Sequence, residues 1–263
     1  MLNSNAKRFE TPQGCVCIHD VVDNHVEFLD ALLDLYGELF PQYSAALPRV
    51  REKALLPANA DPRFIRHQWV ITCNEYPAGL ASFKLALRQN LGICLSLGIR
   101  PAYRSMAWQN YRRFSDFVIQ QMIRQLELDA DVHGIPAPAG LVVEVEMATS
   151  TTDSVVKKSR LHLLERYREY GFVPLPITYH EPAYVRNYDN GQTRSQVTND
   201  AEPMQLLLLF LQDQEHLSYP DLLGRVVDAL LVEHYGLSED DWIVQQARES
   251  IKRIGEDKNG RNN

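Results

Sequence analysis

Two glutamates lie in an apolar segment of the chain, where carboxylates are rare. The segment runs from Leu141 to Met147, and strand alternation places Val142, Glu144 and Glu146 on one face. A buried carboxylate needs an ion-pair partner, water or a binding site. Apolar walls or a second carboxylate raise a carboxyl pKa toward the range of a general base. The pattern therefore indicates either a proton-accepting site or structural ion pairs with arginine, and the sequence leaves both open.

A short basic turn is the second feature that could do chemistry. Arg100 to Arg104 follows an apolar strand-like segment, Leu91 to Ile99, and precedes a long amphipathic segment, Ala107 to Leu128. A strand, a turn and a helix start in this order present free backbone N–H groups and a positive dipole end to an anion. The N–H groups expected at the helix start are those of Ser105, Met106, Ala107 and Trp108.

The strand before this turn has one face of small residues. These are Gly92, Cys94, Ser96 and Gly98. A face without bulky side chains allows another backbone or a helix to approach closely. Close helix packing is therefore one interpretation of this strand.

The elements that position these residues follow from hydrophobic periodicity. Strands are predicted at Cys15–Val22, Gln68–Asn74, Leu80–Leu87, Leu91–Ile99, Leu141–Met147, Phe172–Tyr184 and Met204–Leu211. Helices are predicted at Asp23–Phe40, Tyr43–Leu55, Ala107–Leu128, Ser159–Tyr170, Tyr219–His234 and Ser238–Ile254. Antiparallel hairpins in the first half and one βαβ crossover predict an α/β fold with a mixed, mostly antiparallel central sheet flanked by helices.

We expect four regions along the 263 residues. Residues 1–13 form a mobile N-terminus and 14–212 a single α/β domain. Residues 213–255 form a helical extension that either docks on the domain or mediates a homodimer, and 256–263 form a disordered tail. The polar segment Asn187–Glu202 is expected to be an insertion.

The composition of the chain makes several classes of binding partner unfavourable. The net charge of -7 makes nucleic acid and anionic membranes unfavourable partners. No apolar run approaches the roughly 20 residues of a membrane helix, and no signal peptide is apparent. Four cysteines without a C-x-x-C pair are typical of buried thiols in a reducing cytosol. Eight histidines without H-E-x-x-H spacing predict no metal site. We therefore expect a cytoplasmic protein.

The element order and three local sequences resemble the GNAT superfamily of acetyl-CoA-dependent N-acetyltransferases, over about residues 15–211. The segment LGIRPAYRSMAWQ, 97–109, lies where the family has a strand end followed by Arg/Gln-x-x-Gly-x-Gly/Ala. The segment RLHLLERYREYGF, 160–172, places Tyr167 four residues before a Gly-Phe pair, as in the family. Tyr179-His180-Glu181-Pro182 resembles a bacterial subgroup whose last hairpin begins Tyr-x-Gln-Pro, with Glu181 in place of the glutamine.

The resemblance implies a binding site for acetyl-CoA. Its diphosphate would lie at Arg104–Gln109, with Arg104 in the place of the family's arginine, and its pantetheine arm would pair with the strand end like an added strand. The implied cofactor-binding residues are Leu97, Gly98, Ile99, Arg104, Ser105, Met106, Ala107, Trp108 and Gln109. Ala107 and Gln109 replace glycines that let the backbone approach a diphosphate.

The resemblance also implies catalytic roles. Glu144 or Glu146 would take a proton from the amine of a small molecule or peptide, directly or through water. Tyr167 would donate a proton to the leaving thiolate, and no acyl-enzyme would form. Two other functions stay open: a catalytically silent module of the same fold that binds a ligand or protein, which the missing glycines favour, and a hydrolase or metal enzyme on an unrelated α/β sheet.

Overall fold

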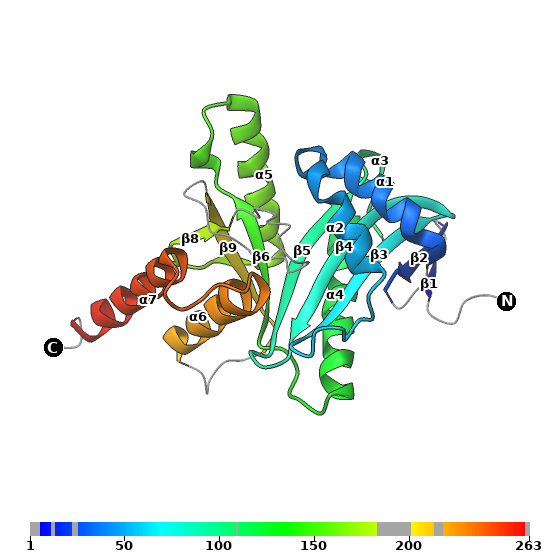
Figure 1. The fold of residues 1–263 in the computed structure, drawn as a ribbon. Coiled ribbons are helices and arrows are strands. Elements are labelled where there is room, and N and C mark those ends of the chain that lie inside the picture. The colour runs from blue at the N-terminus through cyan, green and yellow to red at the C-terminus, as the bar shows by residue number, and fades with distance from the viewer. Residues whose placement is uncertain are drawn as a thin grey trace. The chain divides into compact units, whose positions relative to one another are not determined.

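The chain forms two compact units, which are described separately. The computed structural model describes residues 6–11, 14–22, 26–108, 110–182, 201–212 and 218–260 (Figure 1). The first unit comprises Met1–Leu87 and Cys94–Ala137, and the second comprises Arg88–Ile93 and Pro138–Asn263. Strand β5 (Leu91–Ile99) therefore begins in the second unit and ends in the first.

The strands of the first unit follow one another in space as they do in the chain. The order is β1 (Lys7–Thr11), β2 (Gly14–Asp20), β3 (Phe64–Cys73), β4 (Tyr76–Ala86) and β5. The first four form antiparallel pairs. Most residues of β3 and β4 are buried, as expected for strands that are covered on both faces.

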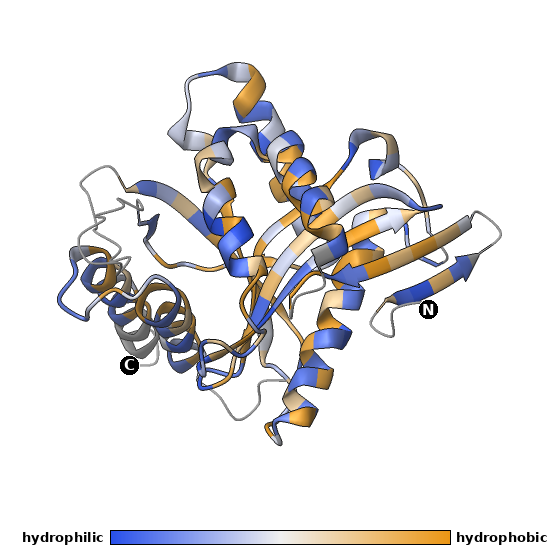
Figure 2. Ribbon diagram, turned by 45° about the vertical axis from the view of Figure 1, so that its right-hand side comes forward, coloured by the Kyte–Doolittle hydropathy of each residue, from blue (hydrophilic) through white to orange (hydrophobic). Residues whose placement is uncertain are grey.

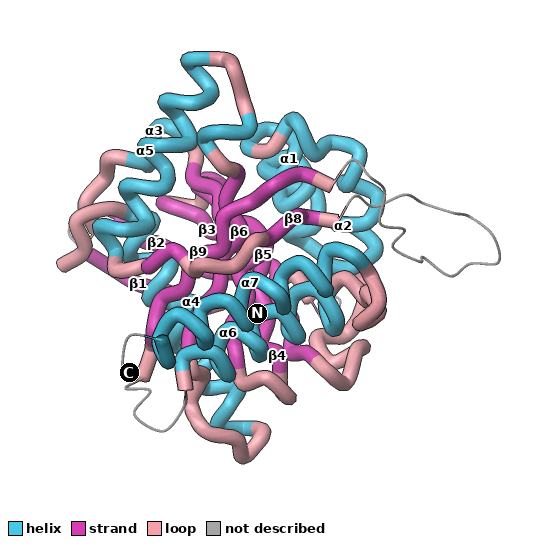
Figure 3. Tube along the Cα trace, turned by 90° about the vertical axis from the view of Figure 1, so that its left-hand side faces the viewer, coloured by secondary structure: helices cyan, strands magenta, loops and turns pink. Residues whose placement is uncertain are grey.

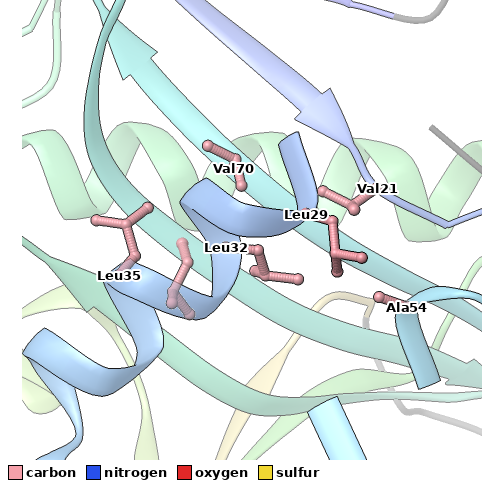
Figure 4. Close-up of a cluster of buried hydrophobic side chains, with 7 residues drawn as sticks. Val21, Leu29, Leu32, Leu35, Ala54 and Val70 are labelled. Carbon is pink, nitrogen blue, oxygen red and sulfur yellow. The ribbon is translucent and has the colours of Figure 1, made fainter. Parts of the chain in front are cut away.

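Helices cover both faces of this sheet. After the 3-10 turn η1 (Val26–Phe28) come α1 (Leu29–Leu39), the 3-10 turn η2 (Pro41–Ala46) and α2 (Leu47–Ala54). Leu29, Leu32 and Leu35 recur along one face of α1 and pack against the strand that carries Val70 (Figure 4). The helix α4 (Phe114–Val132) also contacts β4, and Figure 4 shows it behind the strands.

The sequence of α4 explains why it packs as it does. Phe114, Phe117, Val118, Met122 and Leu126 are buried, and apolar residues alternate with polar ones along the helix (Figure 2). This spacing produces the apolar stripe that a sheet-covering helix needs.

The second unit is built around β9 (Glu202–Phe210). This strand pairs antiparallel with β6 (Gly140–Glu146), β7 (Val173–Pro174) and β8 (Tyr179–Glu181). The 3-10 turn η3 (Ala148–Ser150) and the helix α5 (Ser154–Tyr170) lie between β6 and β7. After β9 come α6 (Tyr219–Val227), the π-helical segment η4 (Asp228–His234) and α7 (Trp242–Gly260). Helices α6 and α7 lie side by side (Figure 3).

The predicted architecture, a mixed, mostly antiparallel sheet flanked by helices, is confirmed. The end of α5 is also confirmed, because Gly171 adopts φ +112° in the left-handed region. This helix begins at Ser154 rather than Ser159. The reason is the side chain of Asp153, which accepts hydrogen bonds from the backbone N–H groups of Val155 and Val156.

The predicted start of the long helix at Ala107 is wrong. Helix α4 begins at Phe114, because Arg113 has extended backbone angles of φ -139° and ψ 155°. Ahead of it, a backbone bridge joins Trp108 and Tyr111 and turns the chain.

The two chain ends also differ from the prediction. Residues 7–11 form β1 instead of a mobile segment, because β1 pairs with β2 and Phe9 packs edge-on against Phe117 at 5.0 Å. Helix α7 continues through 256–260, where a disordered tail was expected, and no proline interrupts it there. Of the predicted insertion at 187–202, residues 187–200 lie outside the described residues. None of the described helices is long and apolar enough to cross a bilayer.

Candidate active site

Four glutamates of the second unit share one face of three neighbouring strands. They are Glu144, Glu146, Glu181 and Glu202. In the strand register, Met204 lies opposite both Glu146 and Tyr179, and Glu181 lies opposite Glu202. Residues in register share a face, and so do residues two apart along a strand. The predicted common face of Glu144 and Glu146 is therefore present, and β8 and β9 each add one carboxylate to it.

Glu144 is held by two tyrosine hydroxyls. The hydroxyl of Tyr179 donates a hydrogen bond to Glu144 Oε1, and that of Tyr235 donates to Oε1 at 2.9 Å and to Oε2 at 3.2 Å. Burial and the nearby charge of Glu144 raise the pKa of Tyr179 well above its usual value, so Tyr179 stays protonated and a donor. Tyr235 directly follows the π-helical segment η4, which the sequence did not reveal.

Glu146 forms an ion pair with Arg160 of α5, at 2.6 Å between carboxylate oxygen and Nη2. Arg160 Nη1 also donates to the carbonyl of Met147 at 3.1 Å and to the hydroxyl of Ser150 at 2.8 Å. These contacts fix the arginine on β6 and on the turn that follows it. Of the two alternatives that the sequence left open, Glu146 therefore shows the ion pair with arginine.

Glu181 is a glutamate of this cluster whose pKa is raised. Burial raises the pKa of its carboxyl to about 7, and the charges of Glu144, Glu146 and Glu202 act in the same direction. The hydroxyl of Tyr235 opposes the shift. A carboxyl with a pKa near 7 can accept a proton at neutral pH and release it again, as a general base must.

Tyr167 lies on α5 in the same unit. Its ring packs edge-on against Phe172 with 5.0 Å between ring centroids, and the side chain is half-buried. Tyr167 therefore has the packing role that is usual for a half-buried tyrosine. Its predicted role as an acid stays a prediction.

The predicted diphosphate loop lies in the first unit. Arg104 ends the short helix α3 (Pro101–Arg104) and is exposed. Its Nε donates to the carbonyl of Ile99 at 2.8 Å, and its two Nη groups make no hydrogen bond or ion pair with any residue that the structure describes. The guanidinium is therefore oriented by the end of β5 and retains donors for an anion.

Two of the four expected backbone donors are already used. The N–H of Met106 donates to the carbonyl of Tyr103 at 3.1 Å, and that of Trp108 donates to Tyr111 at 3.2 Å. The expectation of free N–H groups at these two residues is wrong, because the loop turns on itself before the long helix begins. Ser105 and Ala107 are exposed, and Gln109 lies outside the described residues.

The side chain of Trp108 is fully buried, with its ring centroid 6.0 Å from Phe114 and 6.3 Å from Phe117. It therefore packs beneath the start of α4. Its Nε1–H has no hydrogen-bond acceptor among the described residues.

The small-residue face of β5 packs against a helix at Gly98. A Cβ added there would lie 2.9 Å from Leu39 Cδ1 and 3.0 Å from Phe40 Cε2, at the end of α1. Close helix packing thus explains Gly98. Leu97 on the other face is half-buried and Ile99 is buried. Pairing of this strand end with a ligand stays a prediction.

The predicted cofactor residues thus belong to the first unit, and the predicted catalytic residues belong to the second. Glu181 was not predicted to be a base, although a glutamate in place of the glutamine of Tyr-x-Gln-Pro was a signal for it. No group of three or more His, Cys, Asp or Glu in the described part of the chain is arranged to hold a metal ion.

No protein-family model and no curated protein matches this sequence. The chain is similar to acetyltransferases of known structure. An acetyltransferase from Bacillus subtilis in complex with CoA is 13% identical, with a TM-score of 0.38 over 79% of this chain and 99% of that one.

Two further structures are similar to the same degree. A GNAT-family acetyltransferase from Desulfovibrio desulfuricans is 12% identical, with a TM-score of 0.44 over 75% of this chain and 99% of that one. An aminoglycoside 6'-N-acetyltransferase complexed with coenzyme A is 14% identical, with a TM-score of 0.45 over 74% and 97%. Similarities with TM-scores below 0.5 carry no conclusion about the function of this chain.

Proposed function

We propose that this protein is an acetyl-CoA-dependent N-acetyltransferase that acts on an amine of a small molecule or peptide. The observation that carries the proposal is Glu181, a carboxyl with a pKa of about 7 in a cluster of glutamates. An amine is protonated at neutral pH and becomes a nucleophile only after it loses that proton. A base of this strength matches the task.

In the proposed reaction, Glu181 accepts a proton from the acceptor ammonium, and the neutral amine attacks the thioester carbonyl of acetyl-CoA directly. The carbon–sulfur bond then breaks, and the departing thiolate takes a proton from the hydroxyl of Tyr167. The nitrogen of the new amide loses its second proton to the Tyr167 phenolate, which restores the tyrosine, and Glu181 releases the first proton to solvent. Glu144, held by Tyr179 and Tyr235, adds a second carboxyl group near Glu181 that can help to attract a cationic acceptor. Glu146 is paired with Arg160, and we assign it a structural role.

For the cosubstrate, Arg104 is the residue best suited to bind phosphate. Its guanidinium is exposed, oriented by the carbonyl of Ile99, and has Nη donors without partners among the described residues. We expect Arg104→Ala to weaken acetyl-CoA binding about tenfold, as loss of a charge-assisted hydrogen bond does. Arg112→Ala is the matched control, because Arg112 is an exposed arginine of the same loop, and it should leave binding unchanged.

One observation favours a second candidate, a module of this fold that binds a ligand or protein without transferring an acyl group. Trp108 is fully buried, and the N–H groups of Met106 and Trp108 are already used. Isothermal calorimetry with acetyl-CoA separates the two candidates. Saturable heat that Arg104→Ala diminishes supports the enzyme, whereas no heat at millimolar acetyl-CoA supports the silent module.

A further inference from the structure

Two cysteines alternate along β2 in the first unit. Cys15 and Cys17 share the half-buried face of the strand, and their sulfurs are 3.6 Å apart. The residues on the other face, Val16 and Ile18, are buried in the core. The two thiols are therefore in contact with each other on the side of the sheet that solvent reaches.

The neighbouring strand places charges over these thiols. In the register of β1 and β2, Glu10 lies opposite Cys15 and Arg8 lies opposite Cys17, so all four side chains share one face. Arg8 pairs with Glu10 at 2.9 Å and is more than half exposed. Burial raises the pKa of the Cys17 thiol, and the positive charge of Arg8 opposes that shift.

We propose that Cys15 and Cys17 form a redox-active dithiol, which low-molecular-weight disulfides such as oxidised glutathione convert to an intrastrand disulfide. The Cys15 or Cys17 thiolate attacks the small disulfide, forming a mixed disulfide and releasing one small thiolate. The second cysteine thiolate attacks the protein sulfur of that mixed disulfide and releases the other. The two protons lost by the cysteines go to the two leaving thiolates, so one disulfide bond forms and one is broken.

The strand geometry makes this disulfide easy to reduce. Alternate residues of a strand are about 6.6 Å apart, near the upper limit of about 6.8 Å that a disulfide tolerates between its Cα atoms. Cys15 is the second residue of β2 and follows Gly14, whose φ of +135° favours glycine. The Cys15 N–H donates to Asn74 Oδ1 at 2.8 Å and its carbonyl accepts from the Asn74 N–H at 2.7 Å, so closing the disulfide bends the strand against these bonds and leaves the disulfide strained. A strained disulfide is a labile one, as expected for a reversible modification.

The other two cysteines provide an internal comparison. Cys73 and Cys94 are each only 5% exposed. Cys73 lies opposite Val16 in the register, so its side chain is on the face that Cys15 and Cys17 do not occupy. We expect neither to react while the protein is folded.

The test is oxidation of the full-length protein with oxidised glutathione, followed by mass spectrometry of the intact chain and peptide mapping. The wild type should lose the mass of two hydrogen atoms, the linked peptide should contain Cys15 and Cys17, and reduced glutathione should reverse the change. Cys73→Ser should behave like the wild type. Cys15→Ser and Cys17→Ser should form no internal disulfide and should instead carry one glutathione each.

Two results would overturn the proposal. One is a linked peptide that joins Cys15 to Cys73 and disappears in Cys73→Ser. The other is a wild-type protein that keeps all four thiols after incubation with excess oxidised glutathione. Because the two thiols are half-buried and serine is isosteric, the single variants should fold, which their thermal melting can verify.

Discussion

Glu181 lies in a different environment from Glu144 and Glu146, whose carboxylates have hydrogen-bonding or ionic partners. Glu144 accepts hydrogen bonds from two phenols, and Glu146 is paired with Arg160. Glu181 is largely buried and has like charges on β6 and on the opposite residue of β9. Its proton affinity is therefore set by burial and by its neighbours together, and changes to those neighbours should move it in a defined direction.

The hydroxyl of Tyr235 lowers the pKa of Glu181, so its removal should raise that pKa. We expect the pH at which kcat/KM reaches half its maximum to shift upward in Tyr235→Phe. Tyr219→Phe, a change on the same C-terminal helices, is the control and should leave the midpoint in place. A profile that does not move in Tyr235→Phe would mean that Tyr235 does not act on the base.

Tyr167 is proposed to protonate the leaving thiolate. Loss of a general acid costs about 100-fold or more in rate, so we expect Tyr167→Phe to lower kcat by that factor with little change in KM. Tyr170→Phe, on the same helix and also beside Phe172, is the matched control. Equal turnover in Tyr167→Phe and the wild type would remove this tyrosine from the mechanism.

At the scale of elements, Gly98 shows how closely β5 and α1 approach. A Cβ at this position would meet the side chains of Leu39 and Phe40 at about 3 Å, which is closer than ordinary contacts. We expect Gly98→Ala to reduce the free energy of unfolding by about 1–3 kcal/mol, the usual cost of overpacking.

Gly37→Ala on α1 is the control, because its Cβ would meet only Leu47 Cδ1 at an ordinary 3.8 Å. Alanine also suits a helix better than glycine, so this variant should gain up to about 1 kcal/mol. Urea denaturation of both variants provides the comparison. Equal stability of Gly98→Ala and the wild type would show that α1 can move away from β5.

The elements that the sequence predicted well are those with local signals. Apolar runs mark β3, β4, β6 and β9, and a glycine with positive φ marks the end of α5. The start of α4 was missed because Trp108 fits the apolar pattern of the helix, which predicts it in the first turn. In the structure Trp108 is buried against Phe114, and the chain turns between these two residues before the helix begins. Strand β1 was missed because its stability comes from pairing with β2 and from Phe9 on Phe117, contacts between distant positions.

The site was predicted in part for the same reason. Glu144 and Glu146 share a face because successive side chains of a strand point to opposite sides, and this alternation can be read from the sequence alone. That β8 adds Glu181 to this face follows from the register of β8 with β9, which no local pattern encodes. Tyr235 directly follows a π-helical segment and is 91 residues from Glu144 along the chain, so its contact could not be foreseen.

At the scale of a whole unit, a buried ion network joins four elements of the first unit. His67 Nδ1 is 2.6 Å from Asp20 Oδ2, and its Nε2 is 2.8 Å from Asp129 Oδ2. Gln125 donates to Asp129 at 2.8 Å, and Lys7 donates to Gln125 at 2.6 Å. The network thus connects β1, β2, β3 and α4.

This network predicts a pH dependence of stability. Burial alone would lower the pKa of His67, but hydrogen bonds to Asp129 and Asp20 raise it from 6.5 to about 9. Because the folded state holds the proton more tightly, the stabilisation is full below pH 6.5 and is lost as the pH rises through 9. We expect the loss to be about 3 kcal/mol, measured by hydrogen exchange of β3.

His67→Gln should lower the stability near neutral pH by about 3 kcal/mol and remove this pH dependence. His162→Gln is the control, because His162 is exposed on α5, and it should keep the wild-type slope. A wild-type β3 whose exchange-derived stability is constant between pH 6.5 and 9 would contradict a charged His67.

For the molecule as an enzyme, the most direct test is the release of CoA thiol from acetyl-CoA with a panel of amines, measured across pH. The wild type should show kcat/KM rising with pH to a plateau with a midpoint near pH 7, the pKa of Glu181. Glu181→Gln should lose about 100-fold or more in rate and the rising limb with it, whereas Glu202→Gln should stay active with a lower midpoint. A Glu181→Gln variant that keeps the wild-type rate and profile would contradict the account.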